Sequence, residues 1–192
     1  MKLAPCQQLF AYWDALRGAR GAPERNDVEP GALRGVLADT FILQFSPKAR
    51  FPFRVVGSRT NALFGRELRG APFLDLWQEV DQFEIARVIE SVADGAQPFL
   101  VGARGGPDGA KLLDLELLLL PLRHHGATHA RLIGCCTPAA NAPWLGLLPV
   151  RALNFASLRA INSPVGEGLH ARRMANSGFR RRGHLFVYSA RN

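Results

Sequence analysis

The strongest constraint on how this chain can fold is a set of five apolar segments of strand length, separated by residues that favour turns. They span residues 40–45, 51–56, 98–103, 111–120 and 130–137. Ser46 and Pro47 separate the first pair, and the run from Gly105 to Gly109 separates the third segment from the fourth. Apolar and β-branched runs bounded by glycine, proline or serine are typical of strands. The sequence therefore predicts a strand pair, a long interval and three further strands.

The interval between the second and third strand segments has the pattern of helices. Gly65, Gly70 and Pro72 interrupt residues 57–77, which favours several short helices over one long one. Asp81 and Glu84 then form a capping-box pattern, and apolar residues recur at helical spacing behind it until Gly95. These apolar residues are Ile85, Val88, Ile89 and Val92. We expect the longer helix to cover one face of the sheet.

A further amphipathic helix is predicted at the N-terminus, over residues 5–18. Leu9, Trp13 and Leu16 share one side of it, and we expect them to pack on the domain. Antiparallel strands with helices on one face of one sheet define an α+β fold.

The C-terminal part differs in charge from the rest. Residues 1–137 carry 16 basic and 15 acidic side chains, whereas residues 138–192 carry 8 and 1. A helix within residues 147–160 and a late strand over residues 184–188 are predicted there. Such a basic segment either binds phosphates or an acidic protein surface, or folds back on the acidic side of the domain.

Several functional classes are disfavoured. The chain has no G-x-S-x-G, phosphate-loop, H-E-x-x-H or C-x-x-C motif, so we expect a protein that is not an enzyme. The first apolar stretch is interrupted by polar residues, and the run 117–122 is too short to span a bilayer. Cys135 and Cys136 are adjacent, which disfavours a disulfide between them, and the third cysteine is Cys6. These features predict a reduced, cytoplasmic location.

The order of elements, together with several local strings, resembles a bacterial family of short PAS proteins, PAS subfamily 5. The strings lie at Trp13–Arg20, Pro23–Leu33, Phe53–Gly57, Gly65–Gly70, Leu115–Leu122 and Arg182–Tyr188. The resemblance implies a PAS-like five-stranded antiparallel sheet with a helical lid, an N-terminal helix and a C-terminal extension. It also implies a sensory or regulatory role in signal transduction. We expect the N-terminal helix and loop at 1–29, the PAS core at 30–138 and the basic extension at 139–192.

Three residues are candidates for a ligand site between the sheet and the lid. Trp77 ends a short helix where a PAS lid closes, so it is predicted either to line a pocket or to anchor that helix. Arg54 and Arg59 offer planar donors to an anionic group, or are simply solvated. The rival to a pocket is an interior filled by phenylalanines. The four concerned are Phe41, Phe53, Phe73 and Phe83.

No cofactor and no metal are expected. The segment Asn61–Phe64 lacks the cysteine of flavin-binding PAS relatives, and residues 82–94 lack the histidine of haem-binding ones. His124, His125 and His129 lie in or beside one turn, but no fourth zinc ligand is spaced to join them.

Two further pairs have competing interpretations. Asp114 and Glu116 share one face of a strand, where they either perform acid–base chemistry or are charges that face solvent or pair with arginines such as Arg123 and Arg131 in the adjoining hairpin. One thiol of the adjacent cysteines is expected to point inward as a small apolar group, with redox sensing as the alternative.

The function predicted from the sequence is that of a stand-alone PAS regulator that binds a partner protein, with gating by a small apolar or anionic ligand as an addition. A homodimer is expected. The alternative is a nucleic-acid-associated factor that uses the C-terminal arginines, although no recognition-helix pattern accompanies them. These arginines are Arg172, Arg173, Arg180, Arg181 and Arg182.

Overall fold

Helices and strands follow one another as the sequence predicts as far as residue 138, and a sixth long strand comes after them. The computed structural model describes residues 1–95, 97–161, 180–182 and 185–187. Its α-helices are α1 (Ala4–Arg17), α2 (Ser58–Phe64) and α3 (Glu79–Gly95). Short 3-10 helices are η1 (Arg25–Asp27), η2 (Pro30–Leu33), η3 (Leu37–Asp39), η4 (Pro47–Ala49) and η5 (Phe73–Leu76). The strands are β1 (Thr40–Gln44), β2 (Phe53–Val56), β3 (Phe99–Gly106), β4 (Leu113–His124), β5 (Ala127–Pro138), β6 (Ala152–Ala160), β7 (Arg180–Arg182) and β8 (Leu185–Val187).

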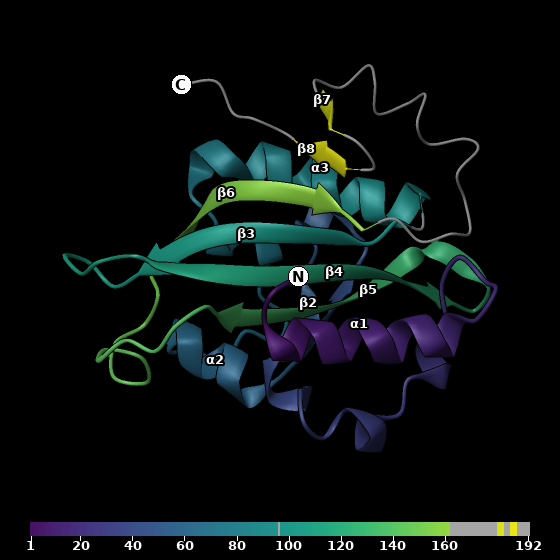
Figure 1. The fold of residues 1–192 in the computed structure, drawn as a ribbon, viewed down its shortest axis with the longest axis horizontal. Coiled ribbons are helices and arrows are strands. Elements are labelled where there is room, and N and C mark those ends of the chain that lie inside the picture. The colour runs from purple at the N-terminus through teal and green to yellow at the C-terminus, as the bar shows by residue number, and fades with distance from the viewer. Residues whose placement is uncertain (96, 162–179, 183–184, 188–192) are drawn as a thin grey trace.

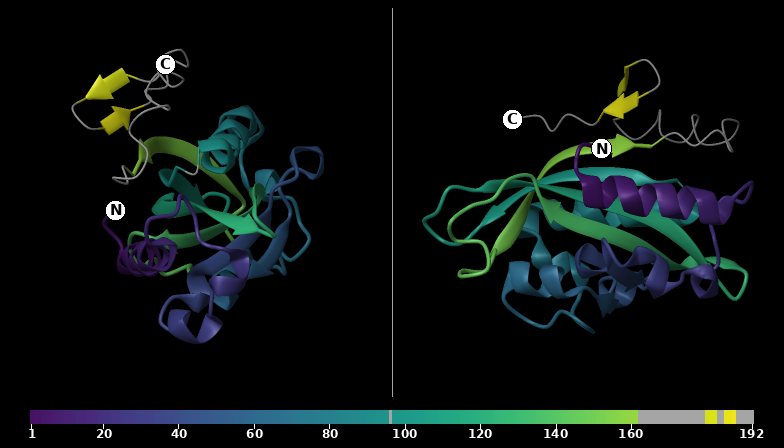
Figure 2. Two further views of the ribbon diagram at one scale, coloured as in Figure 1. Left: turned by 90° about the vertical axis from the view of Figure 1, so that its right-hand side faces the viewer. Right: turned by 60° about the horizontal axis from the view of Figure 1, so that its bottom comes forward.

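All the strands pair antiparallel in one sheet, in the order β2-β1-β5-β4-β3-β6-β8-β7. The first five positions are the predicted meander and strand pair, so the α+β sheet with a helical lid is confirmed. Helices α1 and α3 lie on opposite sides of this sheet (Figures 1 and 2). We call the face under α2, η5 and α3 the inner face, and the face under α1 the outer face.

Strand β4 shows why its sequence is almost continuously apolar. Leu117 and Leu119 belong to the cluster on the inner face, whereas Leu118 and Leu120 belong to the cluster on the outer face. Successive side chains of a strand point to opposite faces, so a strand covered on both sides needs apolar residues at every position.

Helix α1 packs on the outer face through the predicted residues. Leu9 is fully buried and Trp13 is 2% exposed, while half-buried Leu16 packs at the margin of the same cluster. The indole Nε1 of Trp13 donates a hydrogen bond to the carbonyl oxygen of Pro121 at 2.8 Å. The predicted packing of the N-terminal helix is confirmed.

Strand β6 corrects the helix predicted over residues 147–160. It pairs with β3 from Ala152 to Ala160, and a β-bulge leaves Ala156 as an extra residue. The bulge breaks the alternation, so the residues packed on the inner cluster are Leu153 and Phe155 and then Leu158 and Ala160. That spacing imitates helical periodicity, but the edge of β3 offers the backbone of this segment its hydrogen-bond partners.

Two expectations for α3 are wrong. The helix begins at Glu79, so Asp81 lies within it, and the carboxylate of Asp81 accepts a hydrogen bond from the backbone N–H of Phe155 at 2.8 Å. Phe83 is 70% exposed and does not belong to the core. Ile85, Val88, Ile89 and Val92 form the buried side of α3 as predicted. Phe83 lies on the opposite side of the helix, because it is two residues from Ile85.

Candidate functional site

The space between the inner face and the lid is filled by aromatic side chains. The ring of Phe41 lies 5.5 Å from that of Phe53 and 5.7 Å from that of Phe73, measured between centroids. Phe53 and Phe73 are 5.6 Å apart, and Phe73 touches Trp77 at 6.1 Å. These are contact distances for aromatic rings. Aromatic rings therefore fill this region, as the alternative to a ligand pocket predicted. Trp77 completes the group of rings, whereas the predicted Phe83 does not belong to it.

Gly134 shows how tightly the interior is packed. It lies directly opposite Phe41 in the β1–β5 ladder. A Cβ atom at residue 134 would stand 2.3 Å from the ring of Phe41 and 2.7 Å from the carbonyl oxygen of Leu118. The phenylalanine ring thus takes the volume that a side chain at Gly134 would need.

Trp77 is part of this packing. It is 3% exposed, and its carbonyl oxygen accepts a hydrogen bond from the side chain of Gln82 at 3.1 Å. Its indole Nε1 is buried and has no hydrogen-bond partner among the described residues. The position is that of an anchor between η5, α3 and the sheet.

Arg54 and Arg59 are both exposed, whereas Trp77 is buried. Arg59 forms an ion pair of 3.0 Å with buried Asp39, at the junction of η3 and α2. Burial raises the pKa of Asp39, and the guanidinium of Arg59 opposes that shift. Arg54 is the extra residue of a bulge in β2, opposite the step between Ile42 and Leu43. The three candidate residues are therefore not brought together in one site.

A hollow formed by described residues lies elsewhere, between the end of α2 and the segment that leads into β6. It has a volume of about 280 Å³ and is lined by Phe64, Arg66, Pro149, Val150 and Arg151. The backbone N–H of Val150 donates to the carbonyl oxygen of Leu63 at 2.8 Å, which ties this segment to the lid. Arg151 is paired with Asp108 at 3.2 Å.

The two carboxylates of β4 have structural roles. Glu116 accepts hydrogen bonds from the backbone N–H groups of Lys2 and Leu3 at 2.9 and 3.2 Å, at the N-terminus of α1. Asp114 pairs with Arg104 at 3.0 Å. The predicted pairing with an arginine is correct for Asp114, but its partner is Arg104 and not Arg123 or Arg131. Glu116 binds backbone N–H groups at the start of α1 and pairs with no arginine in the described part of the chain.

The cysteines behave as apolar core residues. Cys135 packs in the outer cluster and Cys136 in the inner one, so one thiol of the pair points inward as predicted. Burial raises the pKa of Cys136, and the contact with Cys135 together with burial raises that of Cys6. Buried thiols with a raised pKa carry little thiolate and react slowly.

The histidine-rich turn joins β4 and β5. The rings of His124 and His125 lie 4.1 Å apart, and burial together with the neighbouring His125 and Arg131 lowers the pKa of His124. Within the part of the chain that the structure describes, no group of three or more potential ligands could hold a metal ion.

The feature that sequence reasoning missed is a group of arginines at the end of the sheet near this turn. Arg25, Arg54 and Arg131 have no carboxylate partner among the described residues. Burial lowers the pKa of Arg131, and the nearby charges of Arg54 and Arg25 lower it further. We call these three residues the arginine cluster. The sequence indicates the position of only one of the three. Arg131 alternates with Ile133 and Cys135 along β5, so it lies on the same face of the strand as these two residues.

An antiparallel five-strand core with a helical lid on one face and an N-terminal helix on the other defines a PAS-like domain. A family model described as a PAS domain, PAS subfamily 5, matches residues 1–137. The chain belongs to this family of PAS domains, as the resemblance implied. No curated protein matches the chain. Among the described residues, no helix has both the length and the apolar character that crossing a membrane requires.

The structure describes only part of the predicted C-terminal arginine group. Arg172 and Arg173 lie outside the described residues. Residues 180–182 form the short strand β7, which pairs with β8. Strand β8 in turn adds to β6, and residues 185–187 coincide with the late strand predicted from the sequence.

Proposed function

We propose that the protein is a regulator that acts by binding a partner protein at its surface, without catalysing a reaction. A PAS domain has a sensory or regulatory role, and PAS domains commonly mediate protein interactions. The observation that carries the proposal is the filled interior. Phe41, Phe53, Phe73 and Trp77 occupy the region in which a small ligand would otherwise sit. With this part of the described interior filled, we expect the signal to enter and leave through the surface.

The exposed apolar residues of α3 support this proposal. Val80 is 86% exposed and Phe83 is 70% exposed, and both lie in the first half of the helix, away from the sheet. Large apolar side chains that gather on the surface are typical of protein interaction sites. A homodimer remains part of the proposal, although the buried side of α1 is already used by the chain's own sheet.

Site-specific photo-crosslinking in the native cell tests the proposal. A photoreactive amino acid replaces Phe83, Arg54 or Arg34, one at a time, at exposed positions on different parts of the surface. We expect a discrete crosslinked protein from at least one position, which then binds the purified chain in calorimetry. Crosslinks to nucleic acid alone would favour the alternative function through the C-terminal arginines. Turnover of a small molecule by the purified protein would contradict the proposal.

A further inference from the structure

The arginine cluster is a concentration of positive charge that the fold does not neutralise. Arg131 is half-buried in β5, opposite Gln44 of β1. Arg54 lies on β2, the next strand beyond β1. Neighbouring strands are about 4.8 Å apart, so the backbones of the two residues are separated by roughly 10 Å. Long arginine side chains on two such strands can reach a single anionic group.

Arg25 approaches the same place from the segment that follows α1. It belongs to η1, which a capping box between Glu24 and Asp27 stabilises. Glu24 also pairs with Arg123 at 3.6 Å, next to the turn between β4 and β5. The backbone that carries Arg25 is therefore fixed against the sheet.

Nearby acids are used by other arginines. Asp27 pairs with Arg20 at 3.0 Å, and Glu24 with Arg123. A half-buried cation without a carboxylate partner is costly, and like charges close to it add to that cost. An anion from another molecule would relieve both costs at once, which is what distinguishes this cluster from arginines that are simply solvated.

From this arrangement we propose that the arginine cluster binds an acidic segment of the partner protein. The guanidinium groups of Arg25, Arg54 and Arg131 would form charge-assisted hydrogen bonds with its carboxylates. The inference rests on the proposed function, because it names the surface through which partner binding takes place.

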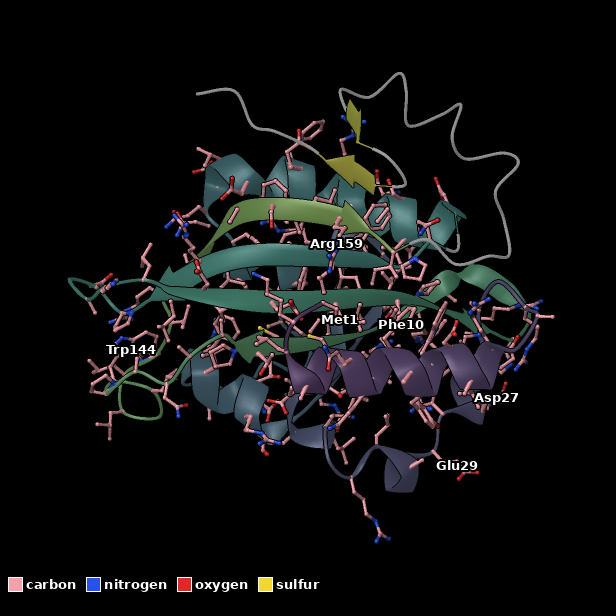
Figure 3. The ribbon with its side chains drawn as sticks, in the orientation of Figure 1. Met1, Phe10, Asp27, Glu29, Trp144 and Arg159 are labelled. Carbon is pink, nitrogen blue, oxygen red and sulfur yellow. The ribbon has the colours of Figure 1, made fainter. Side chains whose placement is uncertain are left out.

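The surroundings of the cluster favour a short acidic peptide segment over a nucleic acid. Val55, next to Arg54, is an exposed apolar residue on the outer face, opposite Ile42. It offers an apolar contact that a phosphate backbone does not use. Asp27 and Glu29 lie near the C-terminal end of α1 (Figure 3), close in sequence to Arg25. Asp27 shares η1 with Arg25, so the positive surface ends on this side and has room for a short acidic segment only.

Titration of the full chain with a short oligoglutamate peptide, followed by NMR, tests the inference without the partner in hand. We expect shifts of the arginine Nε signals of Arg25, Arg54 and Arg131 and of the backbone amides of β2. Replacing all three arginines with glutamine is expected to weaken binding on the order of 10-fold, as three surface ion pairs of modest strength imply. The folded state should keep or gain stability, since a repulsion is removed.

The matched control is a second triple variant, in which three arginines outside the cluster are changed to glutamine, so that the net charge changes by the same amount. Arg34, Arg66 and Arg87 are exposed arginines without a salt bridge in the described part of the chain, and Arg54 and Arg25, not these three, are the arginines whose charges act on Arg131. Changing these three to glutamine should leave peptide affinity within about twofold. An equal loss of peptide affinity in the two triple variants would overturn the inference, because net charge alone would then explain the binding.

Two further probes separate the occupants. Inorganic phosphate or a single-stranded DNA oligonucleotide that binds the cluster more tightly than the peptide would overturn the assignment to a protein segment. Partner binding that is unaffected by the cluster variant would also overturn it, while the proposed function would stand. Loss of affinity for the purified partner in the cluster variant alone supports it.

Discussion

The two faces of the sheet are covered in different ways. The inner face is closed by α2, η5 and α3, and rings from both layers interlock over it. The outer face is covered mainly by one helix, α1, and by the chain that follows it. Arg54 and Arg131 remain there at the end of the sheet, without carboxylate partners among the described residues. The inner face thus carries the interlocked aromatic rings, whereas the end of the outer face retains charged groups that another molecule can contact.

Each face of the sheet buries one tryptophan to a similar degree. Trp13 on the outer side is 2% exposed, and Trp77 on the inner side is 3% exposed. The indole N–H of Trp13 is hydrogen-bonded, whereas that of Trp77 has no partner in the described region. The two tryptophans are therefore equally buried but differ in the hydrogen bonding of their indole Nε1 atoms.

The largest expected effect is the loss of either aromatic anchor. Trp77→Ala should lower the free energy of unfolding by about 3–5 kcal/mol, because it opens a cavity in a packed interior. Trp13→Ala should cost a similar amount on the outer face. Phe83→Ala is the matched control, since Phe83 is exposed, and should change stability by no more than about 0.5 kcal/mol. Chemical denaturation measures all three, and a cost below about 1 kcal/mol for Trp77→Ala would show that the interior is not packed.

A smaller effect distinguishes the two tryptophans directly. Trp13→Phe leaves the buried carbonyl oxygen of Pro121 without its donor, which costs about 1–3 kcal/mol in addition to the lost ring area. Trp77→Phe removes a donor that has no described partner, so it should cost less. Denaturation curves of the two variants check the order, and the reverse order would mean that the Nε1 atom of Trp77 does have an acceptor.

The attachment of α1 to the outer face yields a further prediction. Glu116→Gln should destabilise the protein by about 1 kcal/mol, because a carboxylate at a helix N-terminus accepts backbone N–H groups and meets the positive end of the dipole. Hydrogen exchange of the first amides of the chain should also accelerate. Asp114→Asn, two residues away in an exposed pair with Arg104, is expected to change stability by at most about 0.5 kcal/mol. Equal effects of the two changes would contradict the role given to Glu116.

The smallest effect concerns the ion pair of Arg59 with Asp39. Arg59→Gln removes the charge that favours ionised Asp39, so it should cost less than about 1 kcal/mol at neutral pH, because Arg59 is largely exposed. Burial places the pKa of Asp39 above its ordinary value in the folded protein. The contribution of Arg59 is therefore present at neutral pH and is lost as the pH falls through the raised pKa of Asp39. Unfolding curves across this range check it, and a difference independent of pH would contradict the pairing.

The core fold could be predicted from the sequence because its strands and the longer lid helix have distinct local patterns. Ile85, Val88, Ile89 and Val92 face the sheet as their spacing indicated. Strand β6 was not predicted, because the bulge at Ala156 replaces simple alternation with a mixed spacing. Its identity as a strand depends on pairing with β3, which is a long-range interaction.

The candidate site was less predictable for the same reason. Trp77 was correctly placed between lid and sheet, but whether it lines a pocket or fills the core depends on the rings around it. Arg25 and Arg131 are over one hundred residues apart in the sequence, and no local sequence pattern indicates that they lie close together in the fold. Arg54 was identified as a candidate, yet a bulge in β2 decides its surroundings.

We propose that the interior filled by Phe41, Phe53, Phe73 and Trp77 binds no small ligand and that signalling takes place at the surface. Native mass spectrometry of the protein purified from its own cells distinguishes this proposal from a ligand-bound interior. We expect a mass equal to that of the polypeptide, alone or bound to another protein, in both the wild type and the Trp77→Phe variant. A small molecule bound stoichiometrically to the wild type and lost from Trp77→Phe would contradict it.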